Sequence, residues 1–231
     1  MGNILNDLIN LFYPRTCVIC KNILITDEEH LCLDCLCDLP ETNYHTSKGN
    51  PAKVLFAGYP QVDEVTAFLF FEKEGVAQRL IHSLKYYGDK RLAEYLGRFA
   101  ALKLKDYGFY APVDVIIPVP LHRKKQRLRG YNQSEIIARG IASVYGCKIE
   151  TSLIERIIHT KSQTHKSVYE RHANVEEVFS LTEAEALHGK HILLVDDVMT
   201  TGATISACIE ALRGIPEIRI SIFSLSIARE Y

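Results

Sequence analysis

Four cysteines near the N-terminus have the spacing of a metal site. Cys17 and Cys20 form one C-x2-C pair, and Cys32 and Cys35 form a second pair after eleven intervening residues. Each pair can present two thiolates to one ion, so the two pairs complete a tetrahedral set of four sulfurs. Four protein ligands leave no open position for water or substrate. The spacing therefore predicts a structural Zn2+ site.

Two alternatives stay open for the chemistry of this site. An iron–sulfur cluster also binds four thiolates, and His30 or Cys37 is close enough in the sequence to replace one ligand.

Residues 1–13 lack the basic start and long apolar centre of an export signal. We therefore expect a reducing cytoplasm, where clustered cysteines bind metal rather than form disulfides.

A second group of chemically useful side chains follows a short apolar run at residues 192–195. In an open α/β sheet, the ligand site lies where strands end, and a loop that leads into a helix N-terminus suits phosphate. Two carboxylates there would accept hydrogen bonds from sugar hydroxyls or help to hold Mg2+. Capping of the next helix is the simpler alternative for them. The predicted ribose 5-phosphate site consists of Asp196, Asp197, Thr200, Thr201, Gly202, Ala203 and Thr204.

Positive charge is concentrated in a second predicted loop, which follows the apolar run at 113–119. Its basic residues are Arg123, Lys124, Lys125, Arg127 and Arg129. Such a loop at a strand end suits a pyrophosphate group. A solvated basic loop is one alternative, and a patch for single-stranded nucleic acid with Tyr131 as a stacking platform is another. The polar stretch 159–174 is interpreted as a lid over a diphosphate or as an ordinary exposed loop.

Alternating patterns predict the elements that position these groups. Strand-like runs occur at 66–71, 113–119, 151–158, 175–181 and 192–195, with a final alternating run at 218–227. Helical spacing of apolar residues separates most of them, which predicts an α/β fold with a largely parallel sheet flanked by helices. The stretch 40–60 is rich in Pro, Gly, Asn, Ser and Thr and is interpreted as a linker. We expect an N-terminal helix and metal module at 1–50 and a second domain at 51–231.

Composition narrows the class of protein. Of the 231 residues, 47% are apolar and 24% are charged, which is the balance of a globular protein. The 27 basic and 28 acidic residues give a net charge of -1, so a basic field over the whole protein is excluded while a local basic patch is not. No apolar run reaches the ~18 residues that a membrane span needs.

The order of the motifs resembles the ComF family, whose relatives are called competence protein ComFC or GntX-like proteins. The cysteine pairs are followed by Leu84-Lys85-Tyr86, by a Pro-Val-Pro-Leu-His string at 118–122, and by Arg-Gly-Tyr-Asn-Gln at 129–133. The string at 192–204 is similar to the phosphoribosyl-diphosphate (PRPP) signature of type I phosphoribosyltransferases. The family pattern also includes three residues in the predicted lid: Gln163, Arg171 and Asn174.

This resemblance implies a zinc knuckle followed by a phosphoribosyltransferase-like domain that binds PRPP with Mg2+. It assigns the ribose hydroxyls to Asp196 and Asp197 and the 5-phosphate to residues 200–204. It also implies a role in natural transformation, with single-stranded DNA and proteins of DNA uptake or recombination as partners.

Three functions are compatible with these motifs. The first is an enzyme that transfers the phosphoribosyl group as pyrophosphate leaves, although no acceptor substrate and no catalytic base can be assigned. The second is a protein that handles single-stranded DNA. The third is a regulator that senses PRPP without chemistry. Catalysis and binding need the same phosphate and ribose contacts.

Overall fold

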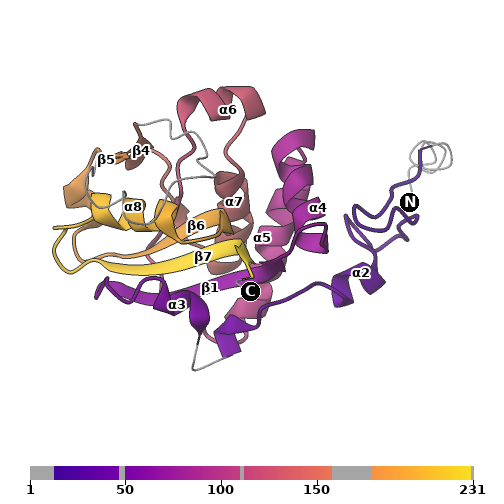
Figure 1. Ribbon diagram of the computed structural model, residues 1–231, viewed down its shortest axis with the longest axis horizontal. Helices are drawn as coiled ribbons and strands as arrows, with labels where there is room; N and C mark the ends of the chain where they lie inside the picture. The colour runs from indigo at the N-terminus through magenta and orange to yellow at the C-terminus, as the bar shows by residue number, and fades with distance from the viewer. Residues whose placement is uncertain (1–12, 47–49, 110–111, 158–177, 230–231) are drawn as a thin grey trace.

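A five-stranded sheet forms the centre of the computed structural model, which describes residues 13–46, 50–109, 112–157 and 178–229. Every neighbouring pair of strands is parallel, in the order β1-β7-β6-β2-β3 (Figure 1). The predicted α/β architecture is confirmed. The strands are β1 (Val62–Phe71), β2 (Val115–Pro118), β3 (Lys148–Ile149), β6 (His191–Met199) and β7 (Arg219–Ala228).

Helices cover both faces of the sheet because its strands bury side chains on both sides. In β6, Leu193 and Val195 join one core, while Ile192 and Leu194 join the other. The first core contains α4 (Val76–His82), the π-helical turn η2 (Ser83–Tyr87), α5 (Lys90–Lys105) and α7 (Gln133–Tyr145). The second contains α3 (Pro51–Val54) and α8 (Ala203–Ala211).

The helices α5 and α7 cross at two glycines. A Cβ atom on Gly97 would lie 2.2 Å from the carbonyl oxygen of Ile137, and one on Gly140 would lie 2.1 Å from the carbonyl oxygen of Glu94. Real Cβ contacts are never this short, so only glycine allows the two backbones to approach so closely. This crossing fixes the position of α7, whose first turn reaches the end of β6.

Two strands differ from the sequence expectation. The strand β6 continues through both carboxylates to Met199, because Asp196 pairs with Ser224 and Met199 pairs with Ile227 on β7. The strand β7 is buried along nearly its whole length rather than alternating. It lies between β1 and β6 with helices on both faces, so neither of its faces meets solvent.

The cysteine-bearing segment, residues 13–39, packs against α5. Leu24 and Leu31 are buried in the same core as α5 and α7. Arg98 on α5 donates two hydrogen bonds to the carboxylate of Glu29, at 3.0 and 3.1 Å. The segment includes the short helix α2 (Leu33–Cys37). Packing and charge therefore join the segment to the rest of the chain.

Residues 40–42, which belong to the predicted linker, run antiparallel along the outer edge of β1. The N–H of Thr42 donates to the carbonyl of Phe68 at 3.0 Å, and the N–H of Phe70 donates to the carbonyl of Pro40 at 2.8 Å. These bonds pair the outer edge of β1 with the chain that leaves α2. The domain boundary near residue 50 stays a prediction.

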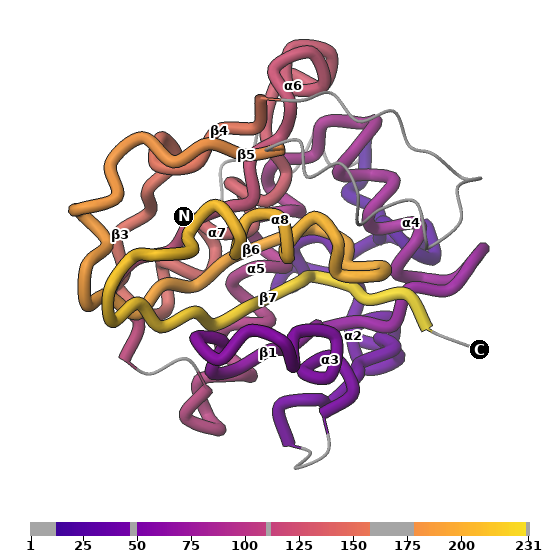
Figure 2. The backbone as a smooth tube through the Cα atoms, turned by 60° about the vertical axis from the view of Figure 1, so that its left-hand side comes forward, coloured from indigo at the N-terminus to yellow at the C-terminus, as the bar shows by residue number. Residues whose placement is uncertain are grey.

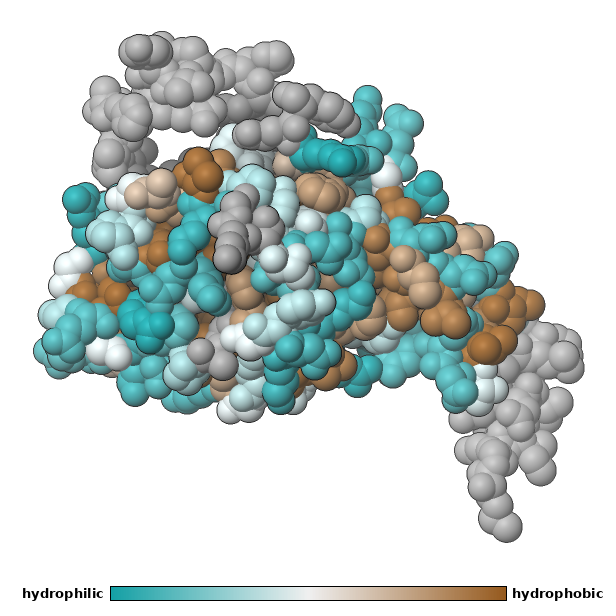
Figure 3. Space-filling view, turned by 90° about the horizontal axis from the view of Figure 1, so that it is seen from below, coloured by the Kyte–Doolittle hydropathy of each residue, from teal (hydrophilic) through white to brown (hydrophobic). Residues whose placement is uncertain are grey.

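Apolar side chains also remain on the surface of the cysteine-bearing segment. Figure 3 shows hydrophobic residues gathered at the end of the molecule that carries it. Tyr13, Ile23, Ile25 and Leu33 are all largely exposed. The helix predicted over 1–13 lies almost wholly outside the described residues.

A small antiparallel hairpin stands beside the main sheet. Its strands are β4 (Ile154–Arg156) and β5 (Phe179–Leu181), which match two of the predicted strand-like runs. Short helical turns occur at η1 (Tyr44–Thr46) and η4 (Ala184–Leu187). In the part of the chain that the structure describes, no helix is long and apolar enough to cross a membrane.

Candidate functional site

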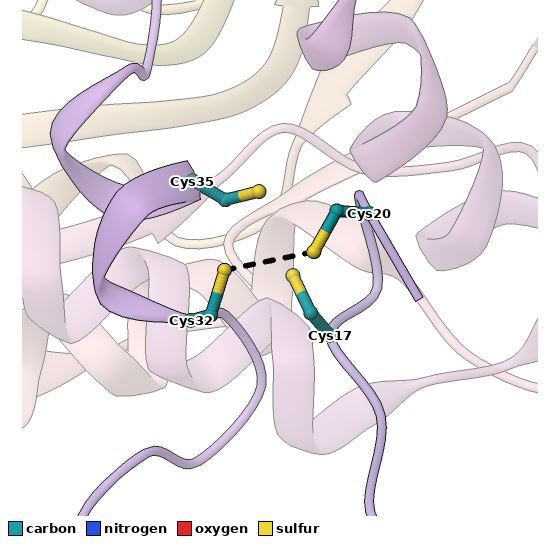
Figure 4. Close-up of side chains that lie close together, drawn as sticks. All are labelled: Cys17, Cys20, Cys32 and Cys35. Atoms are coloured by element: carbon teal, nitrogen blue, oxygen red, sulfur yellow. Dashed lines mark hydrogen bonds between the residues drawn. The ribbon is translucent and has the colours of Figure 1, made fainter. Parts of the chain in front are cut away.

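The four cysteines of the predicted metal site converge on one point. Their Sγ atoms all lie within 4.8 Å of one another, and Figure 4 shows the side chains directed toward a common centre. The Sγ atoms of Cys20 and Cys32 are 3.6 Å apart. Tetrahedral bonds of about 2.3 Å to a zinc ion would place the sulfurs roughly 3.8 Å apart. The donor set therefore fits such an ion.

The two alternative ligands lie elsewhere. Cys37 is exposed and falls outside the group of converging thiols. The ring of His30 packs against the ring of Tyr95, with centroids 5.5 Å apart. Neither residue therefore replaces a ligand in the described geometry.

The pKa values of the cysteine thiols indicate that a cation would be needed for all four to be ionised. Burial raises the pKa of Cys17, but N–H groups of Cys20, Cys32 and Ile19 outweigh burial and bring that pKa to about 6. At Cys35, burial and the neighbouring thiols both raise the pKa. Cys17 thus ionises more readily than an ordinary thiol, whereas Cys35 resists ionisation. A metal ion in their midst supplies the charge that lets all four ionise.

The two carboxylates of the PRPP-like string lie at the end of the central strand β6. Asp196 is buried, and its Oδ1 accepts hydrogen bonds from Ser134 Oγ at 3.1 Å and from the N–H of Asp197 at 2.9 Å. Burial and the nearby charge of Asp197 raise the pKa of Asp196 to about 7. The helix-cap interpretation fails, because the N-cap of α8 is Gly202.

Asp197 is paired with a lysine that the sequence analysis did not place in the site. Lys85 Nζ lies 2.9 Å from Asp197 Oδ2, and the two side chains are only 21% and 14% exposed. The π-helical turn η2 presents this lysine, and Tyr131 holds the turn by donating its O–H to the carbonyl of Leu84. Lys85 was visible in the Leu84-Lys85-Tyr86 motif, but no sequence spacing connects it with β6.

The loop after β6 turns tightly into α8. Gly202 has φ +74°, and a Cβ atom on it would lie 3.1 Å from Cζ of Phe56. The first N–H groups of a helix have no partner within the helix, and the N-cap residue of α8, Gly202, has no side chain to offer them. Asp196 and residues 198–205 line a hollow of about 40 Å³ at this point. The corner has the small size and the free donors that a phosphate group needs.

The predicted basic loop is a helix instead, α6 (Arg123–Arg129). It begins at His122, whose Nδ1 accepts from the N–H of Lys124 at 3.2 Å, and ends at Gly130, which has φ +79°. Both end signals are readable in the sequence, but the density of charge suggested a loop. Figures 1 and 2 show α6 between the β4–β5 hairpin and α4.

Helix geometry separates the five basic residues. The pKa of Lys125 is lowered by its burial and by the charges of Arg156, Arg129 and Lys85, while Asp197 acts in the opposite direction. Lys125 and Arg129 lie one helical turn apart and are both half-buried, and the charge of Asp197 acts on Lys125. The other three, Arg123, Lys124 and Arg127, are exposed, and Arg123 forms an ion pair with Glu155 on the hairpin. Arg156 on β4 is a further cation that the sequence did not indicate.

The residues after α6 connect it with the carboxylates. Arg129 donates to Gln133 Oε1 at 2.9 Å. Asn132 caps α7 by accepting from the N–H of Ser134 at 3.1 Å, and its Nδ2 donates to the carbonyl of Val119 at 3.0 Å. Tyr131 is buried, so its interpretation as a stacking platform is wrong. This stretch positions the site rather than contacting a ligand with its aromatic ring.

The predicted lid residues cannot be placed. Gln163, Arg171 and Asn174 lie outside the described residues, between β4 and β5. Their assignment stays a prediction.

Comparison with known proteins identifies relatives of this chain. The phosphoribosyl transferase domain family matches residues 131–223. The DNA utilization protein YhgH of Escherichia coli O157:H7 is 30% identical over 200 residues, which cover 85% of this chain and 83% of that protein. Its counterpart in Salmonella typhimurium is 31% identical over 137 residues, 58% of this chain and 59% of the relative.

A third relative carries a different name. Competence protein F of Haemophilus influenzae is 33% identical over 110 residues, 46% of this chain and 48% of that protein. The matched parts cover between 48% and 83% of the lengths of these three relatives, and 59% of the protein from Salmonella typhimurium. Among solved structures, a purine phosphoribosyltransferase from Pyrococcus horikoshii is 19% identical, with a TM-score of 0.32 over 58% of this chain and 82% of that one.

Proposed function

Because this chain belongs to the ComF family, whose members include DNA utilization protein YhgH and competence proteins F and ComFC, we propose that it binds PRPP with Mg2+ and serves in the use of incoming DNA. One observation carries the proposal. The buried Asp196 and its paired neighbour Asp197 lie beside an uncapped helix N-terminus and face a group of cations. This arrangement supports a sugar that carries phosphates at both ends.

Each part of PRPP has a chemical counterpart in the site. The carboxylates of Asp196 and Asp197 would accept hydrogen bonds from the ribose hydroxyls. The backbone donors of residues 200–204 would bind the 5-phosphate. The positive charges of Lys125 and Arg129 would neutralise the negative charge of the diphosphate. Mg2+ bound with PRPP supplies further charge neutralisation at the diphosphate oxygens.

We further propose that the metal at Cys17, Cys20, Cys32 and Cys35 is Zn2+. A closed set of four sulfurs is the usual ligand set of structural zinc. Its role would be to hold the cysteine-bearing segment against α5 in a reducing cytoplasm, where disulfides do not persist. An iron–sulfur cluster would be recognised by its visible absorption, which zinc lacks.

Calorimetric titration tests PRPP binding directly. The zinc-loaded chain is titrated with PRPP in the presence of Mg2+, beside an Asp196→Ala/Asp197→Ala variant. We expect saturable binding by the wild type and a loss of at least ~100-fold in the variant, since two charge-assisted contacts disappear. An exposed carboxylate at the end of α5 provides the control, Asp106→Asn. A folded wild type that does not bind PRPP would refute the proposal.

Release of pyrophosphate then separates the enzyme from the sensor. Transfer breaks the bond between the ribose C1 and the diphosphate oxygen, so pyrophosphate appears in proportion to turnover. We expect release of pyrophosphate only when an acceptor is present, because without one the diphosphate stays attached to the ribose C1. Tight binding of PRPP with no release of pyrophosphate, even when cell extract is added as a source of acceptors, would favour a PRPP-sensing regulator.

A further inference from the structure

Three aromatic rings form an exposed cluster where α4 passes into the π-helical turn. Tyr86 and Tyr87 are 68% and 78% exposed. The ring of His82 lies 4.5 Å from that of Tyr86 and 5.6 Å from that of Tyr87, between centroids. We call these three residues the aromatic turn. A cluster of large exposed rings is typical of a surface that binds a ligand or a partner.

A groove opens directly beside the aromatic turn. It has a volume of about 430 Å³ and separates α4 from the first cysteine turn. Val18 and Ile19 contribute apolar side chains, Lys21 and Arg79 contribute positive charge, and Tyr87 contributes an aromatic side chain. No carboxylate is among the groove-lining residues that the structure describes. The groove is therefore both aromatic and cationic.

A cation of the carboxylate site is next to the aromatic turn in the sequence. Lys85 immediately precedes Tyr86, and the charge of Lys85 acts on Lys125 of α6. The groove itself brings Lys21 and Arg79 together with His82 and Tyr87 of the aromatic turn. Aromatic platforms beside basic side chains suit a polymer of stacked bases and regularly spaced phosphates.

We propose that the aromatic turn and its groove bind single-stranded DNA, with bases stacked on Tyr86 and Tyr87 and phosphates near Arg79 and Lys21. The proposal rests on the DNA role in the proposed function but is independent of PRPP binding. In a duplex the bases are stacked inside the helix, so they cannot stack on Tyr86 and Tyr87. Stacking uses the face of any base, so little sequence preference follows.

Fluorescence anisotropy with a labelled single-stranded oligonucleotide of about 15 bases tests the proposal on the intact zinc-loaded chain. Tyr86→Ala/Tyr87→Ala should weaken binding at least ~10-fold, whereas Tyr86→Phe/Tyr87→Phe should bind as the wild type does, because stacking needs the ring alone. Both positions are exposed, so the fold should survive. Tyr107→Ala, which removes another largely exposed tyrosine at the end of α5, provides the matched control.

Charge provides a second readout. Arg79→Ala should weaken binding and reduce the slope of log affinity against log salt by about one. A duplex of the same sequence should compete poorly. Wild-type protein that binds no oligonucleotide, an alanine double variant that binds normally, or a duplex that binds equally well would each overturn the proposal. If the wild type binds no oligonucleotide, a protein would become the partner to test on this surface.

PRPP titration of the same double variant keeps the two proposals apart. Both tyrosines are largely exposed, and neither lines the hollow beside Asp196, so we expect unchanged PRPP affinity. Loss of oligonucleotide binding with intact PRPP binding supports the aromatic turn. A wild type that binds the oligonucleotide but not PRPP would refute the PRPP proposal and leave this one standing. Loss of both ligands in the variant would indicate a damaged site and overturn the assignment.

Discussion

Asp196 should make the protein less stable than an uncharged residue would at the same position. Its carboxyl group is buried, and burial together with Asp197 raises its pKa from the ordinary 3.8 to about 7. The change that isolates this effect is Asp196→Asn. The amide keeps the shape of the side chain, and its oxygen can still accept from Ser134 Oγ and the N–H of Asp197. The ability to carry charge is lost, and an NH2 group takes the place of the second carboxylate oxygen.

The sign and size of the effect follow from proton linkage. Between pH 3.8 and about pH 7, the folded chain holds a proton at Asp196 that the unfolded chain has released. Wild-type stability therefore falls as the pH rises through this window, and the asparagine variant is spared that loss. Each pKa unit is worth ~1.4 kcal/mol, which limits the effect to roughly 4 kcal/mol. Because local relaxation around the buried charge softens the penalty, we expect a gain of ~2 kcal/mol.

Urea denaturation near pH 5 and near pH 8, without Mg2+, measures the difference. The advantage of Asp196→Asn should grow by about 1–2 kcal/mol between the two conditions. The control Asp106→Asn, at an exposed position, should show no such growth. An advantage that is equal at both pH values, or a variant that is less stable near pH 8, would refute the reasoning. Such a result would mean that the folded state stabilises the ionised carboxylate.

Three further substitutions test the packing and the charges around the site. Lys85→Ala should cost about 1–3 kcal/mol in urea near neutral pH, because Asp197 loses its partner; a smaller cost than at Lys90→Ala, which removes an exposed lysine, would contradict the importance of the ion pair. Gly140→Ala should cost at least ~2 kcal/mol by thermal melting, because its Cβ would overlap the backbone of α5, whereas Gly58→Ala meets open space and should be nearly neutral. Cys32→Ser should abolish binding of one zinc per chain, while Cys37→Ser should bind zinc like the wild type. Equal zinc content in these two variants would contradict the ligand set.

Local signals account for most of the fold, and contacts distant in sequence account for what was missed. Apolar runs and helical spacing predicted the strands and helices around β6. The density of charge at 123–129 predicts a loop, whereas His122 and Gly130 end a helix there. The sequence contains Lys85 in a motif and Arg156 in a strand-like run, but it does not connect either residue with the carboxylates, because each reaches the site from an element far along the chain. A single sequence contains no measure of such proximity.

The candidate site shows the same division. The thiol set could be predicted from spacing, because two C-x2-C pairs bring their own geometry. Asp196 and Asp197 were found by their neighbours in the sequence. The role of Tyr131 could not be found, since an aromatic ring beside basic residues is equally suited to stacking or to burial. Only the contact of its hydroxyl with Leu84 decides between them.

The covering of the outer edge of β1 links the state of the thiols to the solubility of the protein. Residues 40–42 supply that cover, and they continue directly from the helix that carries Cys35. An edge strand without a partner invites pairing with another chain. If the four thiols hold a metal as proposed, an oxidant that releases it would loosen this cover together with the cysteine turns. The first visible sign of thiol damage would then be self-association through β1, before any loss at the carboxylate site.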